Sequence, residues 1–168
     1  MSITDRIAEA RAVIARNAPA GIERRTFAVG DGADYQGALA DLEVREAPDG
    51  SDAEYTVSGR AAVFDDLSVD LGGFRERIKR GAFKRVLGDD VRFLVNHDPS
   101  LLVARTRSGT LRLRESPKGL EFEADAAPVQ VARDLRVWVE RGDMTQCSFA
   151  FRVADDEWTE EDGELIRT

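Results

Sequence analysis

The chain has 168 residues, 42% of them hydrophobic and 33% charged, which suits one domain that buries a hydrophobic core and stays in solution. Lys plus Arg number 24 and Asp plus Glu number 32, giving a net charge of −8. This acidic balance argues against a general nucleic-acid binder. The one cysteine, Cys147, excludes an intramolecular disulfide and a cysteine-based metal cluster, and with a single histidine the sequence predicts no metal site and no cofactor.

The amino-terminal residues lack the apolar core of a signal peptide, and no run approaches the roughly 18 apolar residues that a membrane span needs. We therefore expect a soluble intracellular protein without membrane contact. Residues 1–21 predict a helical arm, in which Ser2 caps a helix from about Ile3 to Arg16. The arm suits either binding of a partner or ordinary packing against the domain.

Residues 22–168 predict one domain, in which residues 30–53 form an insertion or loop. Within it, residues 38–44 fit a helix or a strand equally well. The clearest local signal is a β-hairpin, because residues 110–115 and 120–126 alternate polar and apolar positions around the turn Ser116-Pro117-Lys118-Gly119. Further strands are expected at residues 23–29, 55–64, 74–78, 91–95, 101–107 and 145–153, and helices at residues 82–87 and 128–141.

Many short strands with two or three helices indicate a β-rich α+β fold. We expect a closed or strongly curved, mostly antiparallel barrel flanked by those helices. The acidic run at residues 155–164 predicts a solvated hairpin tip, and residues 165–168 resemble the beginning of a further strand. A basic face is expected within residues 75–85, and a solvated face is favoured there over contact with an acidic segment.

His97 follows the apolar strand at residues 91–95 and is the only histidine, so any acid–base chemistry by an imidazole must use it. In the strand at residues 145–153, Ser148 falls on the face with small or polar side chains, where a nucleophile is open to substrate. Cys147 is a rival nucleophile, but it falls on the apolar face, where a thiol is inert unless its pKa is lowered. On composition alone, a structural histidine and an ordinary serine fit these positions as well.

Seven motifs, in this order and spacing, give the chain from about Glu23 to its end a resemblance to the prohead serine proteases of tailed bacteriophages. They are Ser58-Gly59-Arg60-Ala61-Ala62-Val63-Phe64, Gly72-Gly73-Phe74-Arg75-Glu76-Arg77-Ile78, Gly81-Ala82-Phe83, Val95-Asn96-His97-Asp98, Gly109-Thr110-Leu111-Arg112-Leu113, Gly119-Leu120-Glu121-Phe122 and Cys147-Ser148-Phe149-Ala150-Phe151.

The resemblance implies a fold similar to that of the herpesvirus maturation proteases, with Ser148 as nucleophile and His97 as general base. Asp98 is a candidate to orient His97, although its position beside the ring is unfavourable. The family further implies a strand beyond a position like Thr168 that carries an acidic residue, which is the expected place of the third catalytic group. Without that segment, the present chain would be expected to lack its carboxyl-terminal strand.

The function implied is a serine endopeptidase of capsid maturation that cuts scaffold, or the scaffold segment of the major capsid protein, and itself inside the procapsid. The portal is a further candidate partner, and a homodimer or higher oligomer is a candidate assembly. The expected location is the procapsid in the host cytoplasm, or the bacterial cytoplasm for a prophage-encoded protein. The alternative is a catalytically weak or inactive protease-like module that acts in capsid assembly or scaffolding.

Overall fold

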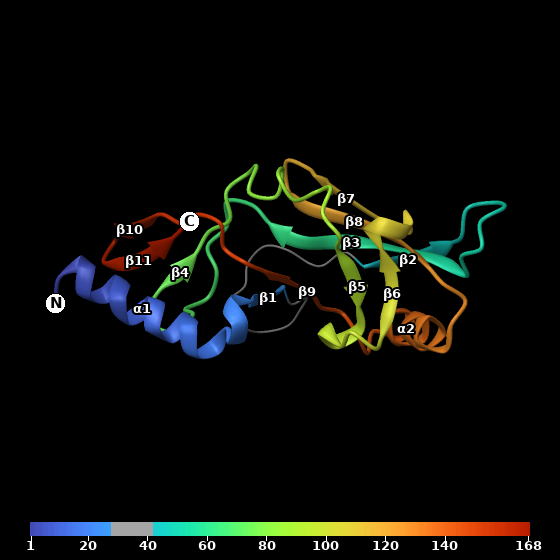
Figure 1. The fold of residues 1–168 in the computed structure, drawn as a ribbon, viewed down its shortest axis with the longest axis horizontal. Coiled ribbons are helices and arrows are strands. Elements are labelled where there is room, and N and C mark those ends of the chain that lie inside the picture. Colours follow the sequence, from blue (N-terminus) through green and yellow to red (C-terminus); the bar gives the residue numbers. More distant parts are fainter. Residues whose placement is uncertain (28–41) are drawn as a thin grey trace.

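The computed structural model describes residues 1–27 and 42–168, with the side chains of Pro19, Thr26 and Phe27 left aside. Its elements form two groups along the long axis of the molecule (Figure 1). One end holds α1, β4, β10 and β11, and the other holds α2 with the strands β2, β3 and β5 to β8. Strands β1 and β9 lie between the two groups. Half of the predicted insertion at residues 30–53, namely residues 30–41, falls outside the described residues.

The larger group is built on a four-stranded antiparallel sheet in the order β2-β3-β8-β7. Its members are β2 (Glu43–Glu46), β3 (Tyr55–Val63), β7 (Leu111–Glu115) and β8 (Gly119–Ala126). The predicted hairpin is therefore confirmed as β7 and β8. Gly119 is required at its turn, because a Cβ there would lie 2.0 Å from the carbonyl oxygen of Ala62. The ambiguous segment at residues 38–44 ends in β2, a strand.

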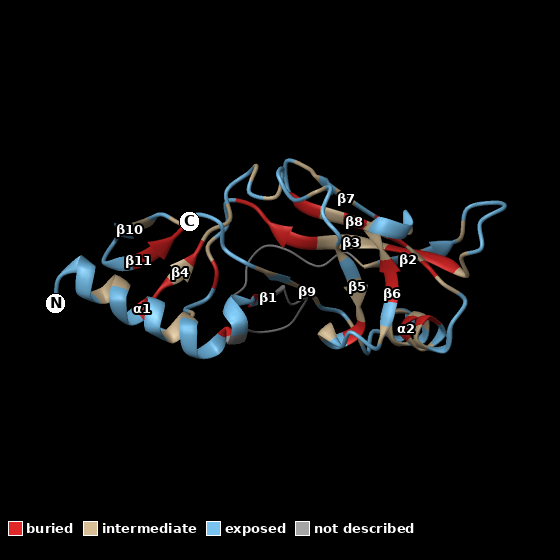
Figure 2. Cartoon of the chain, in the orientation of Figure 1, coloured by how far each residue is buried: buried red, intermediate tan, exposed pale blue. Residues whose placement is uncertain are grey.

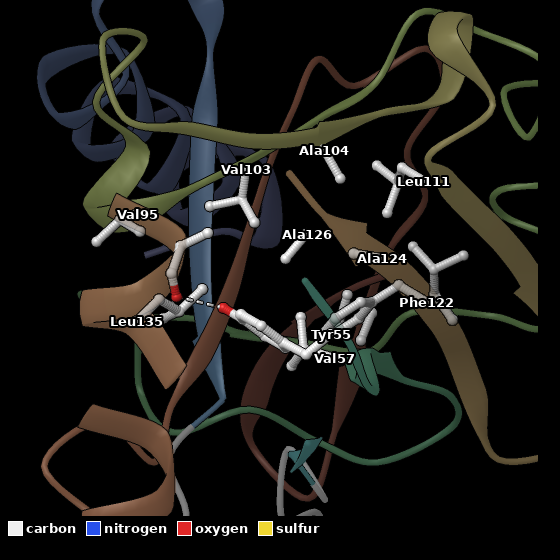
Figure 3. Close-up of a cluster of buried hydrophobic side chains, with 14 of the residues drawn as sticks. Tyr55, Val57, Val95, Val103, Ala104, Leu111, Phe122, Ala124, Ala126 and Leu135 are labelled. Atoms are coloured by element: carbon white, nitrogen blue, oxygen red, sulfur yellow. Dashed lines mark hydrogen bonds between the residues drawn. The ribbon is translucent and has the colours of Figure 1, made fainter. Parts of the chain in front are cut away.

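The main hydrophobic core lies between this sheet, β6 and helix α2 (Gln130–Arg141) (Figures 2 and 3). The alternating side chains of β8 place Leu120, Phe122 and Ala124 in this core. Tyr55 is fully buried, and its hydroxyl donates a 2.6 Å hydrogen bond to the carbonyl of Ala132 on α2 (dashed in Figure 3). The helix ends where predicted, since Gly142 adopts the left-handed conformation at φ 78°.

A second, smaller core lies at the other end of the molecule. Helix α1 (Ile3–Asn17) begins at a capping box between Ser2 and Asp5, as the sequence predicts for Ser2. Its Ala10 is buried with Phe74 and Leu165. The three strands of this end are β4 (Arg75–Glu76), β10 (Trp158–Glu161) and β11 (Glu164–Arg167), in the order β10-β11-β4. The helical arm is thus packed against a sheet.

Four of the basic side chains of residues 75–85 form ion pairs. Arg77 pairs with Glu161 and Lys79 with Glu157 in the β10–β11 hairpin, while Arg75 pairs with Glu164. Arg80 pairs with Asp65. Ion pairs therefore join the acidic hairpin at residues 155–164 to the basic segment at residues 75–85. Strand β11 pairs antiparallel with β10 and parallel with β4, and its residues 165–167 are buried.

The predicted barrel is wrong: among the described residues, no sheet closes into one. Within residues 1–27 and 42–168 the strands divide into four sheets, because there β1 (Glu23–Phe27) pairs only with β9 (Cys147–Phe151), and β5 (Arg92–Leu94) only with β6 (Leu102–Arg105). Closure would need continuous hydrogen bonding around the sheet. A further correction concerns residues 82–87, which form successive turns after Gly81 (φ 92°) instead of a helix.

Candidate active site

His97 lies in a short 3-10 turn, η2 (Val95–His97), directly after β5. The buried side chain of Val95 anchors this turn in the main core. Asn96 and His97 both have left-handed backbone conformations, with φ of 51° and 56°. Such conformations cost free energy in most non-glycine residues, although Asn and His adopt them more readily than most, and strained conformations of this kind recur at functional sites. The strained turn aims the imidazole away from β5 and toward β9.

Ser148 lies in β9, where its neighbours Cys147 and Phe149 pack toward the main core. The Oγ of Ser148 lies 2.6 Å from Nε2 of His97, within hydrogen-bonding distance. Both side chains are half-buried. The structure therefore brings together two residues that are 51 positions apart in the chain and that the sequence singled out. A hydroxyl hydrogen-bonded to an imidazole is the arrangement that activates a serine nucleophile.

The pKa of His97 is lowered by its partial burial and, to a lesser degree, by the positive charge of Arg24 on β1. A lowered pKa keeps the imidazole neutral at neutral pH, which is the form that accepts a proton. Sequence reasoning missed Arg24, because its nearness to His97 depends on the pairing of β1 with β9. No sequence pattern signals that pairing.

Among the described residues, no carboxylate bonds the second ring nitrogen of His97. The Asp98 carboxylate instead accepts hydrogen bonds from the backbone N–H and the hydroxyl of Ser100. Asp65 pairs with Arg80, and Asp70 accepts the backbone N–H groups of Gly72 and Gly73. Within the described residues, the hydrogen bond to Ser148 is thus the only one that the His97 ring makes.

Cys147 has the environment that the sequence predicted, because its side chain packs against the main core. Burial raises the pKa of its thiol to about 11. The thiol is therefore protonated and a poor nucleophile at neutral pH. Within the described residues, no group of three or more His, Cys, Asp or Glu side chains is arranged to hold a metal ion.

Behind the Ser148 face lies a buried cluster of charges, which we call the charge cluster: Glu23 and Arg25 of β1, Glu76 of β4 and Arg167 of β11. Arg25 binds both oxygens of Glu76, with N–O distances of 2.7 Å, and also bonds Glu23. Arg167 bonds both oxygens of Glu23 and one of Glu76. The cluster joins β1, and through it β9, to the smaller end of the molecule.

Glycines and aromatic residues of the segment 72–83 shape the backbone and pack in the two cores. Gly72 and Gly73 have φ of 104° and 95°, and Phe74 is buried in the smaller core. Phe83 packs edge-on against Phe149 of β9, with ring centroids 5.5 Å apart. Phe83 thus supports the strand that carries Ser148 from its buried side.

A family model described as caudovirus prohead serine protease matches residues 40–168, which is well over half of the chain. The match includes Ser148 and His97 but not β1. No curated protein and no solved structure matches the chain. No helix in the described parts of the chain is long and apolar enough to span a membrane. The chain belongs to the caudovirus prohead serine protease family, as its motifs predicted, and the family implies a role in capsid maturation among phage capsid proteins.

Proposed function

We propose that this protein is a serine endopeptidase of phage capsid maturation, with Ser148 as the nucleophile and His97 as the general base. The observation that carries this proposal is the 2.6 Å contact between Ser148 Oγ and His97 Nε2. The family membership supports it, because both residues fall within the matched range. The lowered pKa of His97 supports it further, since a base must be unprotonated before the reaction begins.

The reaction follows from this geometry. His97 Nε2 takes the hydroxyl proton of Ser148 as Oγ attacks the carbonyl carbon of the scissile peptide bond. The carbon–nitrogen bond then breaks, and His97 delivers that proton to the leaving amine. In the second half, His97 takes a proton from water as the water oxygen attacks the acyl-serine ester. Collapse of that intermediate returns the proton to Ser148 and releases the new carboxyl group.

The proposed substrates are the scaffold, or the scaffold segment of the major capsid protein, and the protease chain itself. The reaction takes place inside the procapsid, and the portal and a second copy of this chain are further candidate partners. The family membership supports contact with capsid proteins and a procapsid location.

An assembly module without catalytic activity is the second candidate. It is favoured by the His97 ring, whose second nitrogen has no carboxylate partner among the described residues. Loss of an orienting acid costs about 10⁴ in turnover in serine proteases. The hydrogen bond between Ser148 and His97 favours the peptidase. A module without catalytic activity would not require a strained turn that directs the imidazole at the serine.

The test is co-expression with the cognate capsid protein, followed by mass spectrometry of the products. The parent should cleave the capsid protein, and Ser148→Ala and His97→Ala should each reduce the rate by about 10³-fold or more. Ser51→Ala is the matched control, because Ser51 follows an exposed turn and, among the described residues, hydrogen-bonds through its backbone alone. Equal cleavage by the parent and by Ser148→Ala would show that the proposal is wrong.

A further inference from the structure

The register of β1 against β9 places Arg24 on the same face as Ser148. Thr26 lies opposite Ser148, and Arg24 lies opposite Ala150. Alternate residues of a strand share a face, so Ser148, Ala150 and Arg24 belong to one side of this ladder. Diagonal neighbours across an antiparallel pair lie about 7–8 Å apart, within reach of a long side chain. Ala150 is small and exposed, which leaves the space beside Arg24 open.

Arg24 differs from the arginine next to it in the strand. Arg25 points to the other face, where it is bonded to Glu76 and Glu23 in the charge cluster. Arg24 is exposed, and in the described part of the chain its guanidinium pairs with no carboxylate. Most other arginines of this acidic protein are matched with acids, including Arg6, Arg11, Arg45, Arg75, Arg77, Arg80, Arg105, Arg112, Arg114, Arg133, Arg136, Arg141 and Arg167.

An unmatched cation beside the dyad disfavours the imidazolium that forms during proton transfer. The penalty falls if an anion joins the guanidinium when substrate binds. We propose that Arg24 is a specificity-determining residue that binds an acidic side chain of the substrate, within about two residues of the scissile bond. The offset follows from the geometry: a diagonal separation of about 7–8 Å equals roughly two residues of an extended peptide at about 3.3 Å each.

Arginine is suited to this role, because its guanidinium forms two parallel hydrogen bonds with a carboxylate. The substrate carboxylate is favoured over the oxyanion of the tetrahedral intermediate, because Arg24 lies diagonal to Ser148 and not directly opposite it. Since β1 lies outside the range matched by the family model, this assignment comes from the strand pairing alone. It rests on the proposed peptidase function.

The experiment profiles cleavage of a mixed peptide library, with products identified by mass spectrometry. The parent is compared with Arg24→Glu, and with Arg16→Glu as the matched control, since Arg16 is an exposed α1 residue that also pairs with no carboxylate in the described chain. A cleaved peptide is then remade with Glu, Gln or Lys at the acidic position. For Arg24→Glu we expect kcat/KM on the Glu peptide to fall about tenfold or more, mainly through KM, and that on the Lys peptide to rise.

The assignment would be overturned if the parent cleaved at sites without Asp or Glu near the scissile bond, or if the preference for an acidic residue were unchanged in Arg24→Glu. A fall in kcat that is equal for the Glu, Gln and Lys peptides would also overturn it, because it would assign Arg24 to the oxyanion or to folding. The two proposals fail differently. Cleavage that depends on Ser148 but ignores Arg24 removes only the specificity assignment, whereas absence of Ser148-dependent cleavage removes both.

Discussion

The charged side chains on one face of β1 are hydrogen-bonded to each other, whereas the charged side chain on the other face is exposed. On one face, Glu23 and Arg25 are bonded within the charge cluster, whose Arg167 side chain is only 4% exposed. On the other face, Arg24 is exposed, and the dyad of His97 and Ser148 beside it is held by one hydrogen bond. One face therefore satisfies its charges internally, while the other leaves the Arg24 guanidinium exposed to solvent.

This difference shows how a ladder of two strands can stabilise the fold through one face and carry the candidate site on the other. Buried charges are tolerated only when they are paired, and a paired cluster then fixes the position of the elements that supply it. The charge cluster takes its members from β1, β4 and β11, so it fixes β1, and the Ser148 strand beside it, against the smaller end of the molecule. The turn that carries His97 can adopt strained backbone conformations, because the paired charges on the buried face of β1 contribute stability to the fold.

The largest expected effect is on the charge cluster. Arg167→Met should lower the free energy of unfolding by about 3–5 kcal/mol, because it leaves Glu23 and Glu76 buried with one cation in place of two. Urea unfolding followed by circular dichroism measures it. Arg77→Met is the control; its more exposed pair with Glu161 should cost about 1 kcal/mol or less. Equal losses of unfolding free energy in the two variants would contradict the larger contribution assigned to the buried charge cluster.

The charge cluster should also make the protein sensitive to acid. Burial alone would raise the pKa of Glu23, but hydrogen bonds from Arg167 and Arg25 outweigh it and hold that pKa below its ordinary value of 4.5. A carboxylate with a lowered folded-state pKa contributes stability above its unfolded pKa, and this is lost as the pH falls through the folded value. Unfolding free energies measured from neutral pH to below 4.5 should therefore decline more steeply in the parent than in Glu23→Gln. An identical decline would count against this role of Glu23.

On the exposed face, Arg24→Gln should change the pH dependence of cleavage. Removing a positive charge beside His97 makes protonation of the ring easier, so the pKa of His97 should rise. Because the base must be neutral, the acidic limb of the kcat/KM profile should shift to higher pH. A peptide without acidic residues serves for this measurement, so that substrate binding by Arg24 does not contribute. An acidic limb at the same pH in the parent and in Arg24→Gln would show that Arg24 does not affect the pKa of His97.

The smallest effect is expected at Cys147, on the buried face of β9. Its thiol, with a pKa raised to about 11, stays protonated at neutral pH, so Cys147→Ala should leave kcat/KM unchanged. The native protein should also react slowly with iodoacetamide, while the urea-unfolded protein reacts at the rate of an ordinary thiol. Loss of cleavage in Cys147→Ala without loss of folding would make the thiol the nucleophile.

Local sequence patterns predicted the elements whose signals are local. The hairpin at β7 and β8, the capping of α1 by Ser2 and the end of α2 at Gly142 were all predicted, because each depends on neighbours a few residues away. The alternation in β9 likewise separated Ser148 from Cys147. Residues 82–87 were predicted as a helix and form turns instead, with Phe83 packed against Phe64 and Phe149. That packing is a tertiary contact that overrides a weak local preference.

The sequence by itself singled out His97 and Ser148 as candidates, since one is the only histidine and the other falls on a polar strand face, and ordered motifs identified the family. Only the tertiary structure decided how the strands pair, and with it the four separate sheets, the charge cluster and the place of Arg24. The physical reason is that periodicity tells which face of a strand is buried, but not which distant strand will hydrogen-bond to its edge. That pairing also decides that Arg25 joins the charge cluster, whereas Arg24, next to it in the chain, lies on the face of Ser148.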